Sequence, residues 1–295
     1  MVKSYRVAGH SFNIEANCDL SFWNRIEENY GPFETKEGER PLFSLSVCDS
    51  FDIPDKKAVF SNRDSVKEGF ITIDIYQSGN GHYFEFTQPH SPQTNGKLLI
   101  NGSQSEAKLS LHGNMLEQFN TLNTAANFCF MAATASLNTI MVHSSTIIYK
   151  GKAYMFLGKS GTGKSTHSRM WLNSIMGTEL LNDDHPIIRI DESGTAVAYG
   201  SPWSGKTPCY KNLQAPVGGI VRISRAKHNR ARRLSPIESY ASLMPSCPNL
   251  VWERKFAEYK HSMLQKVISS APCWVMECLP NEDAAIVCRE SVTKP

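Results

Sequence analysis

The sequence lacks the features of membrane, secreted and nucleic-acid-binding proteins. It has no run of about 18 apolar residues, which excludes a membrane-spanning helix, and residues 1–6 contain no signal-peptide core. Its formal net charge of +3 is too small to indicate a nucleic-acid partner. We therefore expect a cytoplasmic protein that binds neither membranes nor nucleic acids.

The chain also lacks the cysteine patterns of zinc sites and disulfide frameworks. None of its 8 cysteines forms a C-x-x-C pair, and none stands at a zinc-binding spacing from a histidine. Several of them, such as Cys129 and Cys288, fall within apolar segments. This pattern indicates reduced, mostly buried thiols in a reducing compartment.

Internal repeats and low-complexity tracts are absent, while the composition is that of a globular protein. The chain has 295 residues, of which 41% are hydrophobic and 20% charged. This length suits one large domain or two modest ones. The pattern changes near residue 112, where strand-like segments give way to a helix. We therefore predict a β-rich N-terminal domain over 1–112 and a second domain over 113–295.

The first domain is expected to form a small antiparallel sheet. Alternating segments over 70–76 and 82–86 predict one hairpin, and those over 97–100 and 107–111 predict another. The aromatic residues before them favour core and loop packing over a ligand site; these are Phe22, Trp23, Tyr30 and Phe33.

The second domain begins with a helix that carries little charge. Apolar residues spaced three and four apart from Met115 to Ala133 lie on one helical face, which we expect to pack against the sheet that follows. A β-branched strand then follows His143, and residues 150–152 turn it into another strand. If the two strands pair, His143 and the end of the second strand lie together.

A glycine-rich phosphate-binding loop follows that second strand. It matches G-x-x-x-x-G-K-[ST], and its residues are Gly158, Lys159, Ser160, Gly161, Thr162, Gly163, Lys164, Ser165 and Thr166. The glycines allow backbone N–H groups to face phosphate oxygens, Lys164 supplies positive charge, and Ser165 offers a hydroxyl to Mg²⁺. Because a helix is expected after Ser165, the phosphates would lie at a helix N-terminus. A nucleoside triphosphate is the predicted ligand.

Two adjacent carboxylates follow the next apolar strand. Asp183 and Asp184 come directly after the segment 178–181. In a phosphate-loop protein, an acid at this place holds Mg²⁺ or accepts a proton from the attacking group. On a plain loop the same pair would be an N-cap or a solvated turn. The upstream phosphate loop favours the functional interpretation.

Two later segments have polar or basic patterns. The loop 200–207 follows a predicted hairpin (186–190 with 195–199) and contains Ser204 and Lys206, which suit a phosphate or an acidic group. A structural turn with a solvent-facing lysine fits that loop nearly as well. The basic stretch 225–233 has no interleaved aromatic residues, so we interpret it as the solvated face of a hairpin. Helices are expected from Ser235 and over 251–268, followed by a strand over 273–278 and a short helix from Asn281.

From His143 to its C-terminus, the chain resembles the HPr kinase/phosphorylase superfamily, which shares its core with ATP-dependent phosphoenolpyruvate carboxykinase. The resemblance is carried by His143, the phosphate loop 158–166, the segment 182–184 and the loop 200–206. Thr166 stands where true HPr kinases usually have glutamate, and their later acidic-arginine-glycine signature is absent. The chain therefore resembles the kinase-like relatives of that group.

The resemblance implies an α/β (α+β) fold with a mixed-sheet core of the carboxykinase type, preceded here by the β-rich region. It implies that Asp183 acts as the general base on a serine-type hydroxyl. Asp184 is then an acid linked to the metal, which Ser165 also binds, and His143 orients groups or handles a proton. The implied cofactors are ATP and Mg²⁺.

The resulting hypothesis is a kinase that phosphorylates a hydroxyl of a peptide, a small protein or a small molecule, with Lys164 and Lys206 balancing phosphate charge. Two alternatives stay open. One is a nucleotide-binding regulatory or assembly module without phosphotransfer, and the other is an ATPase that uses water. A homo-oligomer is compatible with each of them.

Overall fold

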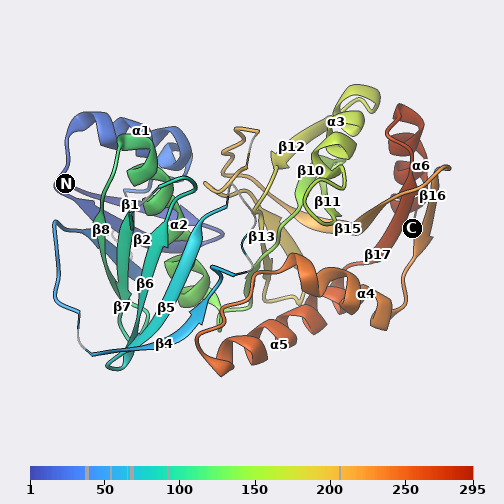
Figure 1. Cartoon of the computed structure of the whole chain (residues 1–295). Coiled ribbons are helices and arrows are strands. Elements are labelled where there is room, and N and C mark those ends of the chain that lie inside the picture. The colour runs from blue at the N-terminus through green and yellow to red at the C-terminus, as the bar shows by residue number, and fades with distance from the viewer. Residues whose placement is uncertain are drawn as a thin grey trace. The chain divides into compact units, whose positions relative to one another are not determined.

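The computed structural model describes residues 1–36, 40–53, 55–64, 66, 70–91, 93–205 and 207–294 (Figure 1). Its contacts divide the chain into two compact units. The N-terminal unit contains Met1–Ala135 and Leu250–Ala257, and the C-terminal unit contains Ser136–Asn249 and Glu258–Pro295. The long helix that follows residue 112 is thus grouped with the strands that precede it.

The N-terminal unit is built on an 8-stranded sheet with the order β1-β2-β3-β8-β7-β6-β5-β4. Both predicted hairpins are confirmed, since β5 pairs with β6 and β7 pairs with β8 in antiparallel fashion. The sheet is nevertheless mixed, because β3 runs parallel to both β2 and β8. Its strands are β1 (Val2–Val7), β2 (His10–Ala16), β3 (Phe43–Val47), β4 (Lys56–Ser61), β5 (Thr72–Ser78), β6 (Gly81–Thr87), β7 (Gly96–Ile100) and β8 (Glu106–Leu111).

A helix that the strand-based interpretation missed lies in this unit. It is α1 (Leu20–Tyr30), which begins where the Asp19 carboxylate accepts a hydrogen bond from the backbone N–H of Phe22 at 2.9 Å. The expected core packing of the aromatic residues is confirmed, because Phe22, Trp23, Tyr30 and Phe33 are all buried. They form the apolar face of α1 and the turn that follows it.

The predicted helix at 115 is confirmed as α2 (Met115–Thr134), which begins with a capping box of Asn114 and Glu117. Its expected partner was wrong, because α2 packs against the preceding sheet. Thr121 accepts a hydrogen bond from Gln88 at 3.1 Å, and a Cβ added at Gly96 of β7 would clash with the Thr121 side chain. This glycine lets the helix approach the sheet closely.

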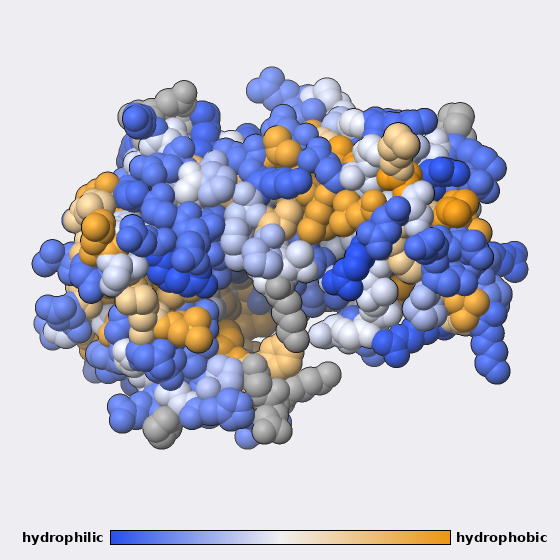
Figure 2. Space-filling view, turned by 90° about the horizontal axis from the view of Figure 1, so that it is seen from above, coloured by the Kyte–Doolittle hydropathy of each residue, from blue (hydrophilic) through white to orange (hydrophobic). Residues whose placement is uncertain are grey.

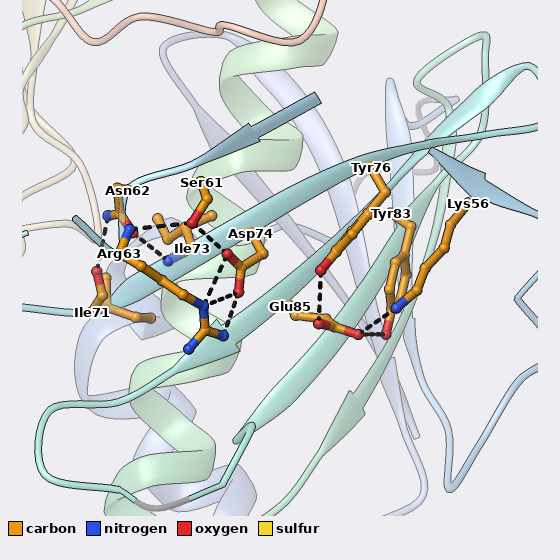
Figure 3. Close-up of polar contacts among 10 residues, drawn as sticks. All are labelled: Lys56, Ser61, Asn62, Arg63, Ile71, Ile73, Asp74, Tyr76, Tyr83 and Glu85. Carbon is orange, nitrogen blue, oxygen red and sulfur yellow. Dashed lines mark hydrogen bonds and ion pairs between the residues drawn. The ribbon is translucent and has the colours of Figure 1, made fainter. Parts of the chain in front are cut away.

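Strands β4, β5 and β6 carry two polar networks on neighbouring positions (Figure 3). In one, the Asp74 carboxylate accepts hydrogen bonds from Ser61 and from the guanidinium of Arg63. In the other, Glu85 accepts hydrogen bonds from Lys56 and from the hydroxyls of Tyr76 and Tyr83; the three distances are 3.0, 3.3 and 2.9 Å. These contacts connect the three strands at the β4 edge of the sheet.

The C-terminal unit contains a 9-stranded sheet, in which β12-β10-β11-β15-β14-β13-β9 form one path and β17 pairs with both β15 and β16. The hairpin predicted from residues 186–199 is confirmed as β13 and β14. The strands are β9 (Thr139–Met141), β10 (Ser145–Tyr149), β11 (Lys152–Leu157), β12 (Thr178–Asn182), β13 (Ile187–Ile190), β14 (Ala196–Tyr199), β15 (Gln214–Arg225), β16 (Arg230–Arg233) and β17 (Cys273–Cys278).

Helices cover both faces of this second sheet. Along β11, the side chains of Met155 and Leu157 pack in a core with α4 (Pro236–Leu243) and α5 (Arg254–Ser270). The intervening Phe156 packs on the other face with α3 (Lys164–Ser174) and α6 (Glu282–Val292). Because successive residues of a strand point to opposite faces, a nearly continuous apolar run is what this buried strand requires.

The interpretation of residues 225–233 as a hairpin was wrong. Strands β15 and β16 do not pair with each other, because β17 lies between them. The three expected helices are confirmed, including the capping box of Ser235 and Glu238 and the N-cap at Asn281. Two strands that are consecutive in the sequence can thus be separated in the sheet by a strand from much later in the chain. Local sequence patterns do not reveal this.

Two mixed sheets and six α-helices thus make up the described part of the chain, which is an α+β fold. All eight cysteines are free. Among the described residues, no helix has the length and apolar character needed to cross a membrane. The surface seen from above is mostly hydrophilic, with apolar residues in smaller patches (Figure 2).

Candidate functional site

Three strands of the C-terminal unit bring the predicted site residues to the same end of the sheet. Strand β10 is antiparallel to both β11 and β12, with Ser145 opposite Phe156 and Thr146 opposite Asn182. The start of β10 therefore lies beside the ends of β11 and β12. His143 precedes the first strand, the glycine-rich loop follows the second, and the Asp183-Asp184 pair follows the third. The expected pairing of the strands around residues 150–152 is confirmed.

The glycine-rich loop joins β11 to the N-terminus of α3. Gly161 and Gly163 have φ values of +78° and +114°, in the region that favours glycine, although a Cβ at either position would meet no atom within 4 Å. Backbone conformation, and not space, therefore requires glycine here. Gly163 is the N-cap of α3 and provides no side-chain cap, so the first N–H groups of the helix stay available to an anion.

Lys164 lies inside this loop. Its side chain is buried, with 8% of the residue exposed, and its Nζ donates to the carbonyl oxygen of Gly158 at 3.1 Å. Burial lowers the pKa of Lys164, and the charges of Asp184 and Asp183 partly oppose that effect. The ammonium group is thus held against the loop by one carbonyl, and the charges of both carboxylates of the candidate site act on it.

Asp184 lies between two histidines. His143 Nε2 is 3.3 Å from one carboxylate oxygen and His185 Nδ1 is 3.0 Å from the other, and the two imidazole rings stack with centroids 5.6 Å apart. Burial would raise the pKa of Asp184, but the hydrogen bond from His185 and the nearby positive groups outweigh it, so the pKa lies below its usual value. Asp184 is therefore a carboxylate at neutral pH.

The pKa of His143 is lowered by burial and then by the charge of Lys164. At neutral pH its ring is therefore uncharged, and its Nε2 lies 3.3 Å from the Asp184 carboxylate. A neutral ring retains one nitrogen without a proton. His143 can consequently both orient Asp184 and receive a proton.

Asp183 is held by a chain of two buried hydroxyls. Ser145 Oγ donates to Asp183 Oδ1 at 2.5 Å, and Ser145 and Ser168 are joined by a hydrogen bond of 2.6 Å. An ionised carboxylate can only accept hydrogen bonds, so the Ser145 hydroxyl donates its proton to the bond with Asp183. The Ser168 hydroxyl must therefore donate to Ser145. This chain links α3, which carries Lys164, to the carboxylate that directly follows β12.

Asn182 fixes the backbone of the acidic pair. Its Oδ1 accepts hydrogen bonds of 2.9 Å from the N–H groups of both Asp184 and His185, and its Nδ2 donates to Ser201. Asn182 is fully buried. The segment is thus an Asx-type turn that is anchored to the loop after β14.

That loop, residues 200–207, packs directly on the acidic pair. Ser204 Oγ accepts a hydrogen bond from the backbone N–H of Asp183 at 3.3 Å and donates to the Thr207 carbonyl at 2.8 Å. A Cβ added at Gly205 would lie 3.1 Å from the side chain of Asp184. The structure therefore places Ser204 beside Asp183, and its role toward a phosphate stays a prediction. Lys206 lies outside the described residues.

Arg225, at the end of β15, also reaches the glycine-rich loop. Its guanidinium donates to the carbonyl oxygens of Gly161 and Thr162, the latter at 3.4 Å. Local sequence reasoning assigned this arginine to a solvated hairpin. Its contact arises because β15 is parallel to β11, which brings their C-terminal ends together.

The remaining loop residues lie between β11 and the first turn of α3. Lys159, Ser160 and Thr166 are exposed, and Ser165 is half-buried. His185, Ser145, Ser168 and Asn182 were missed by the sequence reasoning. His185 and Asn182 flank the acidic pair directly and could have been examined on that ground, whereas nothing in the local sequence marks the two serines.

The oxygen atoms that the site offers to a metal suit Mg²⁺, which keeps much of its water shell, better than a metal ion surrounded entirely by protein ligands. Within the described part of the chain, no three His, Cys, Asp or Glu side chains gather as a metal site. Magnesium typically takes one or two protein oxygen ligands and completes its shell with water and phosphate. The hydroxyl of Ser165 and the carboxylate of Asp184 are ligands of that kind.

Comparisons with known proteins leave the family unassigned. No protein-family model matches the chain, and no curated protein matches it. Among solved structures, the HPr(Ser) kinase/phosphatase from Coxiella burnetii is similar at 9% sequence identity, with 51% of this chain and 86% of that chain covered. The TM-score of 0.32 indicates a distant likeness that carries no weight for fold or function.

Proposed function

We propose that this chain is an ATP- and Mg²⁺-dependent kinase that phosphorylates a hydroxyl group. The observation that supports it best is the convergence of the glycine-rich loop, Lys164 and the Asp183-Asp184 pair at one end of one sheet. Phosphoryl transfer mainly requires positioning and charge neutralisation, and these residue types supply both.

In this proposal the hydroxyl oxygen of the acceptor attacks the γ-phosphorus of ATP. The bond between that phosphorus and the β–γ bridging oxygen breaks, and ADP leaves with the bond electrons. Asp183 accepts the hydroxyl proton, because Ser145 occupies only one of its oxygens. Loop N–H groups and Lys164 balance the negative charge of the phosphates.

Ser165 and Asp184 would hold the Mg²⁺ ion, which supplies charge neutralisation at the phosphates. His143 and His185 keep the Asp184 carboxylate oriented and ionised through the contacts at 3.3 and 3.0 Å. The neutral ring of His143 also offers a site for a proton. The acceptor class is a hydroxyl-bearing peptide, protein or small molecule.

The test is Asp183→Asn, assayed with radiolabelled ATP and cell extract for transfer and by calorimetry for ATP binding. We expect transfer to fall by about 100-fold or more, as for loss of a general base, while ATP affinity stays within a few-fold. The matched control is Asp283→Asn, at an exposed position in the first turn of α6. That variant should transfer phosphate normally.

Other outcomes point to other functions. Equal loss of ATP binding and transfer in Asp183→Asn would contradict the general-base role. Steady ADP formation without any acceptor would identify an ATPase that uses water. ATP binding without either reaction, whichever hydroxyl compounds are offered, would identify a regulatory or assembly module.

A further inference from the structure

A pocket of about 400 Å³ opens beside the glycine-rich loop. It lies within the C-terminal unit, at the end of the sheet where β15 and β17 finish. Small-molecule sites typically have volumes of about 300–1,000 Å³ and mainly apolar walls with a few polar groups. This pocket therefore has the size of a small-molecule site.

One wall of the pocket continues directly from the loop. It consists of Thr162 and Gly163, then Thr166, His167 and Met170 of α3. Residues three and four apart lie on one side of a helix, so this side of α3 runs from the phosphate-binding end into the pocket. A molecule with its phosphates at the helix N-terminus would have its remaining part beside this wall.

The opposite wall comes from the ends of two parallel strands. Ile223 lies near the end of β15 and Ala226 follows that strand, and Leu279 and Pro280 follow β17. Arg225 is the one charged side chain among the described lining residues, and it donates to the loop carbonyls of Gly161 and Thr162. The pocket is thus apolar and continuous with an anion-binding loop.

We propose that this pocket binds the base and ribose of the nucleotide, which rests on the function proposed above. A nucleoside combines a flat, largely apolar ring with a phosphate chain at one end, as the pocket and the loop together require. Contacts from Met170, Ile223 and Leu279 recognise the base by packing. Because hydrogen-bonding side chains are few in the lining, ATP and GTP should bind with similar affinities.

His167 adds one polar group to the wall. Its ring is almost fully buried, with 1% exposed, and Trp171 Nε1 donates to its Nε2 at 3.2 Å. We therefore assign the proton of the neutral ring to Nδ1. That atom has no hydrogen-bond partner among the described residues. A nucleoside would bring ring nitrogens and ribose oxygens, which are acceptors, to this side of α3.

The test compares two probes by calorimetry in the presence of Mg²⁺: ATP and inorganic tripolyphosphate, which has no nucleoside. Leu279→Ala removes part of one wall, and Ala226→Trp fills the pocket. We expect either variant to weaken ATP binding about tenfold, the scale of apolar contacts in a ligand pocket, with tripolyphosphate binding unchanged. The control is Leu172→Ala on α3, since Leu172 lies outside the lining and is exposed to the same 36% as Leu279.

The two probes separate this inference from the function on which it rests. Unchanged ATP binding in both pocket variants, or equal weakening of ATP and tripolyphosphate, would overturn the nucleoside assignment. Failure of the unaltered protein to bind either probe would overturn the proposed kinase function. A wild-type preference of about 100-fold or more between ATP and GTP would contradict recognition by packing alone, since directional hydrogen bonds produce selectivity of that size.

Discussion

Among the described contacts, Ser145 provides the one side-chain hydrogen bond to the Asp183 carboxylate. Ser145 is fully buried and lies two positions after His143. The bond leaves the second carboxylate oxygen for an incoming hydroxyl. Ser168 donates in turn to Ser145, so the direction of the whole chain is set by the carboxylate. In the proposed reaction, the two serines are positioning residues for the general base.

Ser145→Ala tests this positioning. We expect the turnover number to fall about tenfold, the effect of a small misplacement of a catalytic group, with the KM for ATP within about twofold. The matched control is Ser144→Ala, because Ser144 is equally buried but bonds to the Thr146 hydroxyl at 3.0 Å. Equal changes of turnover in both variants would indicate general loosening of β10, and unchanged turnover in Ser145→Ala would contradict the positioning role.

Part of the candidate site could be predicted at this scale. His143 could be placed beside the glycine-rich loop on the condition that the two strands pair, and Asp183-Asp184 were interpreted as functional because the loop lies upstream of them. The contacts of Ser145, Ser168 and Arg225 could not be predicted, since they depend on strand register and on which strands are neighbours.

Helix α3 carries an almost fully buried histidine, His167, in the wall of the pocket. Burial lowers the pKa of His167 to about 4, from its usual value of 6.5. The unfolded chain therefore binds a proton between these pH values that the folded chain does not. The resulting loss of stability is absent above pH 6.5, grows as the pH falls, and is complete below pH 4.

His167→Gln removes this titration while keeping an acceptor for Trp171. From pH 7 to pH 4, we expect the wild-type protein to lose up to about 3 kcal/mol more of its free energy of unfolding than the variant. Denaturant unfolding at several pH values measures this difference. Parallel stability curves for the two proteins would contradict the assignment of the proton-linked loss to His167.

The carboxylate of Asp74 joins β5 to the edge strand β4 and to the residues that follow it (Figure 3). Burial would raise the pKa of Asp74, but hydrogen bonds from Arg63 and Ser61 outweigh it and lower the pKa. Asp74 is 5% exposed, and its charge is therefore stabilised by these two partners.

Asp74→Asn should lower the free energy of unfolding by about 1–3 kcal/mol, because a charge-assisted pair is lost at a buried acceptor. Thermal or denaturant unfolding at neutral pH measures this change. The control is Glu28→Gln, which removes an exposed ion pair with Arg25 on α1 and should change stability by no more than about 0.5 kcal/mol. Equal effects of the two variants would contradict a special contribution of the Asp74 network.

Elements with strong local patterns were the easiest to predict. The hairpins β5–β6, β7–β8 and β13–β14 have short turns, and α2 and α4 have capping boxes. Helix α1 was missed because its aromatic residues were interpreted only as packing groups. The position of β17 between β15 and β16 follows from long-range pairing, which short windows of sequence do not contain.

At the scale of the whole molecule, the segment Leu250–Ala257 belongs to the N-terminal unit although it follows most of the C-terminal one. Trp252 of this segment is 7% exposed. Its ring lies 5.0 Å from that of Phe84 and 5.6 Å from that of Phe128, measured between centroids. An aromatic residue late in the sequence thus completes a core formed by β6 and α2.

Trp252→Ala should lower the stability of the N-terminal unit by about 3–5 kcal/mol, the usual range for removing a buried tryptophan. Denaturant unfolding gives the magnitude, and hydrogen exchange should show faster exchange in β6 and α2. The neighbouring Val251→Ala, at a position that is 43% exposed, is the control. A loss below about 1 kcal/mol would contradict a core role for Trp252.

This return segment also has a consequence for how the protein can be divided or recombined. The chain passes from one unit to the other after residues 135, 249 and 257. A single cut at any of these places leaves the units joined by the other two passages, so limited proteolysis there would nick the protein without separating it. For the same reason neither unit is one continuous block of sequence, and a gene rearrangement that moved residues 136–295 alone would carry away part of the other unit's core.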